Sequence, residues 1–244
     1  MPNRWQFILH FGLVTPAADF IFRRMKRLLP SLSLCTFLSL LPAASTRAST
    51  LISNLGQPTV TAAEGFADTT IRYAWDFQTG ASPADVTALT LRLLNLDLIS
   101  HHITSQLWTN SGSNQPGAFV AAFPDISIAA GTFPPTDLTA TSPGIPLAAG
   151  TIYWIVTGMG EALVNSPFGP GHELVSSGQT MDAGGVFSTV ASTNFLFSGD
   201  SGATWSLSAT ENAFFKLEGT VVPEPSGAFL LLSTAIPILL RRRR

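Results

Sequence analysis

The chain has a single cysteine, Cys35, in 244 residues and carries little charge. With only one thiol, no disulfide can form within the chain. Charged residues make up 11% of the sequence, less than half of the roughly 25% found in an average protein. Without disulfides, stability must come from a buried core, and a chain of this length can build one.

Positive charge is nearly absent from the middle of the chain. Between Ser49 and Val222 there are three cations and thirteen acids, a net charge of −10 hidden within the whole-chain value of −2. The cations are Arg72, Arg92 and Lys216. The acids are Glu64, Asp68, Asp76, Asp85, Asp97, Asp125, Asp137, Glu161, Glu173, Asp182, Asp200, Glu211 and Glu218. Such a body repels polyanions, so we expect no nucleic-acid partner.

A short hydrophobic stretch near the amino terminus follows two cations. Lys26 and Arg27 precede the apolar residues 28–41, and small residues follow as far as Ala48. This order is typical of a secretory signal peptide. We therefore expect residues 25–48 to direct export through the secretion machinery, with cleavage after Ala48 or after Ala44.

Residues 1–24 do not belong to that pattern. They form either a first membrane segment or an extension from a start codon assigned too early, and we favour the second, with Met25 as the initiator. Lipidation of Cys35 is not expected, because Leu34 stands before it where a small residue is needed.

The carboxyl terminus combines a second apolar run with a cluster of cations. Residues 227–240 are mostly apolar and are followed by Arg241, Arg242, Arg243 and Arg244. A helix of that length spans about 21 Å, short of the roughly 30 Å hydrocarbon core of a bilayer. The arginines resist crossing and would hold the chain end in the cytoplasm. We expect a short transmembrane helix that stays in the membrane only for a time.

Residues 221–244 resemble a PEP-CTERM sorting signal, in which a Pro-Glu-Pro motif precedes one apolar helix and a basic end. The motif here is Pro223, Glu224 and Pro225. The resemblance implies that exosortase, a membrane protease-transferase, removes the tail. The protein would then pass from the inner membrane to the cell surface or the extracellular matrix.

Residues 49–220 alternate between apolar and other side chains with the period of β-strands. The clearest runs are TALTLRLLN, GTIYWIVTG and NAFFKLEG, and further candidates are TTIRYAWDF, TSQLWTN, GAFVAAF, STNFLFS and ATWSLSA. Turn-forming clusters lie between them, among them GSNQPG, PPTD, SPGIP and SPFGPG. No amphipathic helix or fixed repeat is found. The sequence predicts an all-β, antiparallel β-sandwich of the jelly-roll kind, with a barrel as the alternative.

This body loosely resembles the choice-of-anchor group of extracellular β domains. The resemblance rests on Leu51–Gln57, Phe77–Gly80 and Leu147–Val156 and would cover most of residues 50–220. It implies no particular activity.

One segment matches two different motifs. Gly199 to Gly202 resembles the serine-nucleophile segment of trypsin-like proteases, which needs a histidine and a carboxylate nearby. The longer pattern fits an Asp-box better, a structural hairpin turn common in carbohydrate-active proteins. Its residues are Ser198, Asp200, Gly202, Thr204 and Trp205. We expect the hairpin and no catalytic residues.

Two histidine patterns suggest a metal but do not satisfy its geometry. His172 and Glu173 begin a zinc-protease motif, but Ser176 occupies the place of the second histidine. His101 and His102 are adjacent, so on a strand they face opposite ways. We expect no metal site and no cofactor. Calcium at a sheet edge is left open, without assigned ligands, because no D-x-D-x-D-G loop is present.

Exposed aromatic rings can stack on sugars, because both surfaces are flat and partly apolar. The candidates are Trp75, Trp108, Tyr153, Trp154 and Trp205. Trp154 is expected in a core and Trp205 in the Asp-box. Trp108, which precedes a polar loop, is the residue that we expect to reach solvent and contact a sugar.

Three classes of function remain. We favour a non-enzymatic structural or adhesive surface protein whose partners are exosortase, the secretion machinery and, transiently, the membrane. The alternative is a carbohydrate-binding module that acts on exopolysaccharide. A hydrolase comes third, because no catalytic constellation or recognisably spaced carboxylate pair is found.

Overall fold

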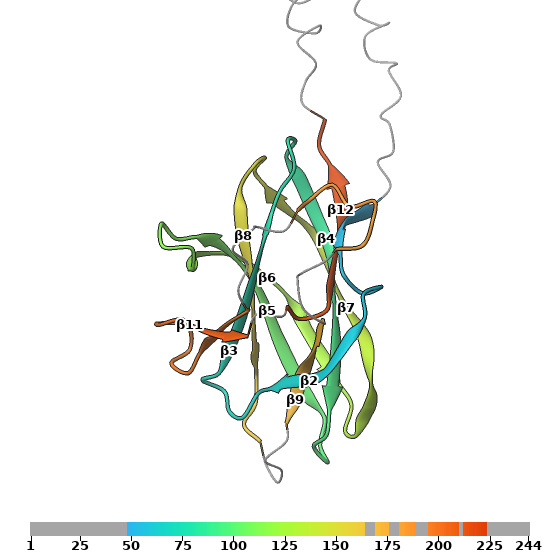
Figure 1. Ribbon diagram of the computed structural model, residues 1–244, viewed down its shortest axis with the longest axis vertical. Coiled ribbons are helices and arrows are strands. Elements are labelled where there is room, and N and C mark those ends of the chain that lie inside the picture. Colours follow the sequence, from blue (N-terminus) through green and yellow to red (C-terminus); the bar gives the residue numbers. More distant parts are fainter. Residues whose placement is uncertain (1–47, 164–168, 176–180, 189–194, 210–211, 224–244) are drawn as a thin grey trace, which may run out of the picture. The chain divides into compact units, whose positions relative to one another are not determined.

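The computed structural model describes residues 48–163, 169–175, 181–188, 195–209 and 212–223. Within these ranges the protein is all-β: there is no helix, and every strand pairs antiparallel with its neighbours. Figure 1 shows the strands arranged in two sheets. The all-β, antiparallel prediction is therefore confirmed for this part of the chain.

The first sheet, here named the β4 sheet, has six strands in the order β1-β12-β4-β9-β2, with β7 paired to the other side of β4. Its strands are β1 (Ser49–Ser53), β2 (Thr59–Gly65), β4 (Ala84–Asn95), β7 (Thr132–Leu147), β9 (Pro170–Val175) and β12 (Phe215–Val221).

The second sheet, the β8 sheet, also has six strands, in the order β11-β10-β3-β8-β5-β6. Its strands are β3 (Arg72–Gln78), β5 (His101–Asn110), β6 (Pro116–Ile128), β8 (Ile152–Met159), β10 (Phe195–Ser198) and β11 (Ser206–Ala209).

One large hydrophobic core draws side chains from both sheets, which makes the arrangement sandwich-like. The β4 sheet contributes the alternating leucines Leu89, Leu91 and Leu93, and the β8 sheet contributes Trp75 and Phe77, all fully buried. At ~25 cal/mol for each Å² of apolar surface removed from water, such a core can stabilise the domain without disulfides.

Each of the eight predicted strand segments overlaps a strand of the structure, although residues 192–194 of STNFLFS lie outside the described residues. The interpretation of PPTD and SPGIP as turns was wrong, because both lie inside β7. This strand pairs with β4 alone, so it is an edge strand. An edge strand tolerates proline, since the missing N–H faces away from the ladder.

Trp154 is fully buried in a core, as the alternation predicted. The core that it joins is a second and smaller cluster, with Ala74, Val156 and Leu196. The main core takes its neighbours Tyr153 and Ile155 instead. Both faces of β8 are therefore covered, and Trp154 belongs to the face that points away from the β4 sheet.

The two ends of the domain are joined by β1 and β12, which pair from Ser49↔Gly219 to Ser53↔Lys216. Just past β1, the buried side chain of Asn54 continues this pairing. Its Nδ2 donates to the Ala213 carbonyl at 2.9 Å, and its Oδ1 accepts from the Phe215 N–H at 2.7 Å. One amide thus satisfies two backbone groups that water cannot reach.

Replacing Asn54 with alanine should destabilise the protein by roughly 2–4 kcal/mol, because a buried carbonyl and a buried N–H both lose their partners. The measurement is chemical denaturation of the purified protein. The control is Thr87→Ala on β4, which removes one half-exposed hydrogen bond of 3.3 Å to the Glu218 carbonyl of β12 and should cost less than about 1 kcal/mol. Equal losses in the two variants would contradict this role for Asn54.

Candidate functional site

The described part of the chain borders both proposed targeting segments but contains little of them. Ala48, the expected cleavage site, and Pro223, the first residue of the sorting motif, are both exposed. Glu224, Pro225 and Arg241 to Arg244 lie outside the described residues, as do residues 1–47. Over the ranges that the structure describes, no helix is long and apolar enough to cross a membrane.

The segment that matched the Asp-box pattern forms the turn between β10 and β11. Asp200 accepts hydrogen bonds from the Thr204 N–H at 2.8 Å and from the Thr204 hydroxyl at 2.7 Å. These bonds, together with one from the Ser198 hydroxyl, lower the pKa of Asp200 to about 2. Gly202 has a φ of +96°, which favours glycine. The carboxylate is thus fully engaged in shaping the turn.

None of the three described histidines contacts Ser201, the residue in the nucleophile position. His101 is buried and bonds to Asp97, His102 is exposed and bonds to Glu161, and His172 bonds to Thr157. His101 and His102 face opposite sides of β5, as expected.

Metal binding finds no support in the same part of the chain. No cluster of three His, Cys, Asp or Glu side chains that could hold a metal ion occurs there. His172 and Glu173 lie on strand β9 and not on a helix.

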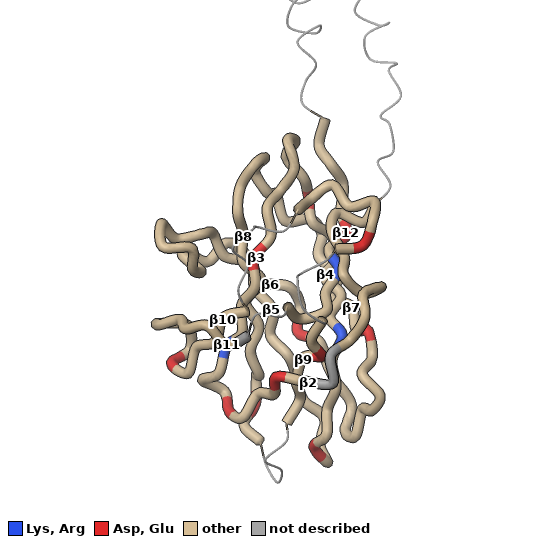
Figure 2. The backbone as a smooth tube through the Cα atoms, in the orientation of Figure 1, with Lys and Arg blue, Asp and Glu red and all other residues tan. Residues whose placement is uncertain are grey.

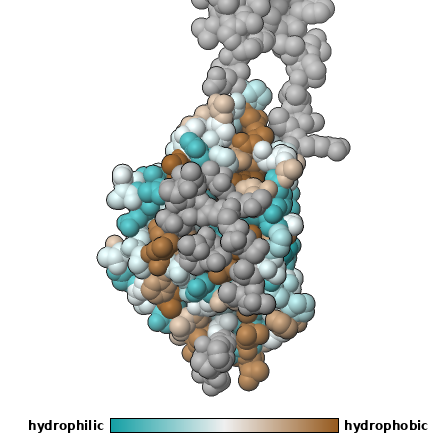
Figure 3. Space-filling view, in the orientation of Figure 1, coloured by the Kyte–Doolittle hydropathy of each residue, from teal (hydrophilic) through white to brown (hydrophobic). Residues whose placement is uncertain are grey.

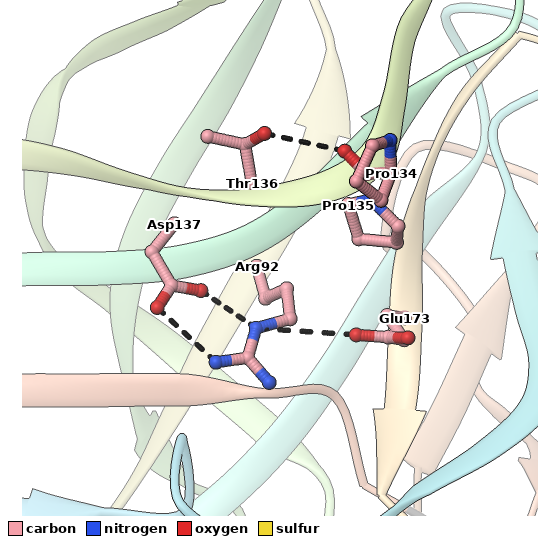
Figure 4. A pocket seen from close by; sticks show the side chains of 6 residues that line it. All are labelled: Arg92, Pro134, Pro135, Thr136, Asp137 and Glu173. Carbon is pink, nitrogen blue, oxygen red and sulfur yellow. Dashed lines mark hydrogen bonds and ion pairs between the residues drawn. The ribbon is translucent and has the colours of Figure 1, made fainter.

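A surface depression of about 530 Å³ lies over β4, β7 and β9 (Figure 4). Arg92 lies in it and donates two hydrogen bonds to Asp137, of 2.7 and 3.1 Å, and one to the Leu55 carbonyl at 3.0 Å. Glu173 lies 3.9 Å away on the other side. The contacts of Arg92 thus link β4 to β7 and β9. Because the guanidinium is already engaged by a carboxylate, the depression is a poor site for an anion.

Aromatic side chains gather on the outer face of the β8 sheet. Trp154 of β8 lies opposite Trp108 of β5, and Trp108 lies opposite Phe119 of β6. The rings of Trp108 and Phe119 meet edge to face at 6.4 Å. The β10–β11 turn adds Trp205, which packs with Trp108 against the buried Trp154.

We name the reachable part of this surface the aromatic face. It consists of half-buried Trp108 and Trp205 together with Phe119 and Leu207, which are 56% and 58% exposed. Gly202 lies between the two indoles: a Cβ placed there would be 3.4 Å from Trp205 and 4.0 Å from Trp108. Of the rings singled out from the sequence, Trp75 and Tyr153 are buried in the main core and cannot contact a ligand.

Three uncharged amides position the indoles. Gln106 accepts from the Trp108 indole N–H at 2.9 Å, and Asn110 accepts from that of Trp154 at 2.8 Å. Gln115 donates to the Trp205 carbonyl at 3.4 Å. Sequence reasoning missed these amides and Phe119, because only the strand register shows which residues lie beside Trp108.

Charged residues are sparse on this domain. Figure 2 shows few basic residues among scattered acidic ones. On the face drawn in Figure 3, hydrophobic side chains form small patches between polar ones.

The chain matches no protein-family model and no curated protein.

Two buried ionisable groups oppose each other in their effect on stability. The Asp76 carboxyl, on the outer face of β3 opposite Trp154, has no hydrogen-bond partner among the described residues. Burial raises its pKa to about 7. His172 is surrounded by the rings of Phe66, Tyr73 and Trp75, and burial lowers its pKa to about 3.

The directions of these shifts fix the pH dependence. Between pH 4 and 7 the folded state holds a proton on Asp76 that the unfolded chain releases, so stability from this group falls as pH rises. Between pH 3 and 6.5 the unfolded chain binds a proton at His172 that the folded state refuses, so stability rises with pH. The two effects offset each other from about pH 4 to 6.5.

Asp76→Asn should therefore raise stability by roughly 2–4 kcal/mol at pH 8 and change it little at pH 4. The stability of the variant should rise from pH 4 to 6.5, because the effect of His172 is no longer offset. Denaturant midpoints measured from pH 4 to 8 test this, with Asp125→Asn, an exposed aspartate, as control. A variant no more stable than the wild type at pH 8 would contradict the assignment.

Proposed function

We propose that this protein is an exported cell-surface or extracellular-matrix protein with a structural or adhesive role, delivered by its carboxyl-terminal PEP-CTERM signal. In this proposal, residues 49–220 form a jelly-roll-like β-sandwich. Residues 25–48 form the signal helix, and residues 221–244 form the sorting tail with one short transmembrane helix. Exosortase is the processing partner.

The observation that carries the proposal is where the tail begins. Strand β12 ends at Val221, and Pro223 follows two residues later, exposed at the edge of the folded domain. The sorting motif thus starts directly after the last strand, without a long linker. A protease in the membrane could cut there and leave the β domain whole.

The pairing of the chain ends adds support. Because Ser49 lies opposite Gly219, the end of the signal peptide and the start of the tail leave the domain side by side. Both membrane-directed segments can therefore be in one membrane while the domain projects from it. A domain whose ends left from opposite poles would have to lie along the bilayer.

A non-catalytic role fits the arrangement of polar groups. Ser201 lies in a turn held by Asp200, and the described histidines are engaged elsewhere. The net charge of −10 between Ser49 and Val222 favours solubility outside the cell and disfavours binding to anionic lipid. An extracellular protein without disulfides then relies on its core alone.

Glu224→Ala should block removal of the tail while leaving membrane insertion intact, since Glu224 lies outside the apolar run. In a host that contains an exosortase, the variant should remain in the membrane fraction at full length, whereas the wild type should be shortened and leave it. Immunoblots of membrane, surface and medium fractions measure this.

Ser226→Ala, next to the motif, is the matched control and should be processed normally. Replacing Arg241 to Arg244 with serine should act differently, through loss of orientation and poor insertion. The sorting proposal fails if Glu224→Ala is processed like the wild type, or if the wild type keeps its tail in hosts with and without exosortase.

A further inference from the structure

The aromatic face has features that folding alone does not require. Its members come from three separate parts of the chain: Trp108 on β5, Phe119 on β6, and Trp205 with Leu207 from the β10–β11 hairpin. These side chains are not part of the main core, which lies on the opposite face of the β8 sheet. The face therefore presents aromatic surface to solvent on a rigid support.

The spacing of the rings follows from the sheet. Trp154, Trp108 and Phe119 lie opposite one another on β8, β5 and β6, and neighbouring strands are about 4.8 Å apart. Trp154 is fully buried, so only Trp108 and Phe119 of this row can contact a sugar. Trp205 is held beside Trp108 by the turn around Gly202 and by the bond from Gln115.

The amides beside the rings still have free hydrogen-bonding capacity. Gln106 and Asn110 each use the oxygen to hold an indole, and Gln115 uses its nitrogen. Within the described ranges, the Nε2 of Gln106, the Nδ2 of Asn110 and the Oε1 of Gln115 have no partner. Two donors and one acceptor, fixed next to flat rings, suit the hydroxyl groups of a sugar.

Charge decides between ligands that stack on indoles. Nucleobases also stack on such rings, but they bring phosphates that need Lys or Arg. The aromatic face and its three amides include no charged residue, and the nearby Asp200 is occupied by Thr204. The net charge of −10 on the surrounding domain repels any polyanion. A neutral ligand is therefore favoured.

We propose that the aromatic face binds a neutral polysaccharide, with one sugar ring stacked on Trp108 and a neighbouring ring on Trp205. The free amide groups of Gln106, Asn110 and Gln115 bond to the sugar hydroxyls. Phe119 extends the stacking surface along the sheet. This inference goes beyond the sorting function and does not depend on it, because processing of the tail leaves this face unchanged.

The test is titration calorimetry of the full-length protein in mild detergent, with cellohexaose, laminarihexaose, mannohexaose and xylohexaose as neutral probes. At least one probe should bind. Trp108→Ala and Trp205→Ala should each weaken this binding about tenfold or more, as expected for the loss of one stacked ring. Gln115→Ala keeps both rings and should weaken binding of the probe severalfold. This variant tests the proposal even if a tryptophan variant fails to fold.

The matched control is Phe133→Ala, which removes a 72% exposed ring from β7 in the other sheet and should bind like the wild type. Polygalacturonate and oligothymidylate are the charged comparisons. Failure of all four neutral probes overturns the proposal, as does binding of the charged polymers alone. Self-association in sedimentation velocity that Trp108→Ala abolishes would also overturn it, because a second copy of the chain would then be the occupant.

Discussion

Pairing between β1 and β12, the first and last of the described strands, holds the two chain ends of the domain together. Strand β12 lies between β1 and β4 and pairs with both, so it connects the edge strand β1 to the centre of the β4 sheet. The buried amide of Asn54 continues this connection beyond the strand. A chain that cannot form a disulfide closes its domain here by hydrogen bonds and burial alone.

This pairing also bears on the proposed route to the membrane. Ser49 and Gly219 are register partners, so segments before the first strand and after the last must leave the domain together. The aromatic face lies on the other sheet, on the side that points away from the β4 sheet. A ligand held there would not compete with strands β1 and β12 for space. The proposed membrane-directed segments and the proposed sugar site thus involve different parts of the domain.

Much of the fold followed from local alternation, as in the leucines of β4 and the β8 segment. The prediction failed where a strand lacks that pattern. Strand β7 carries prolines because only one of its edges is paired, and local sequence does not show which edge that is. The site was harder to predict. Trp108 was identified beside its polar loop, but its neighbours Phe119, Gln106 and Gln115 follow only from strand register and loop packing.

In the proposed route, the folded β domain reaches the outside of the cell without either of the two proposed targeting segments. Intact-mass spectrometry of the protein recovered from the cell surface or medium tests this route. We expect one species that begins near Ser49 and ends near Glu224. A surface species that still includes Arg241 to Arg244 would contradict it, and the tail would then be a permanent membrane anchor.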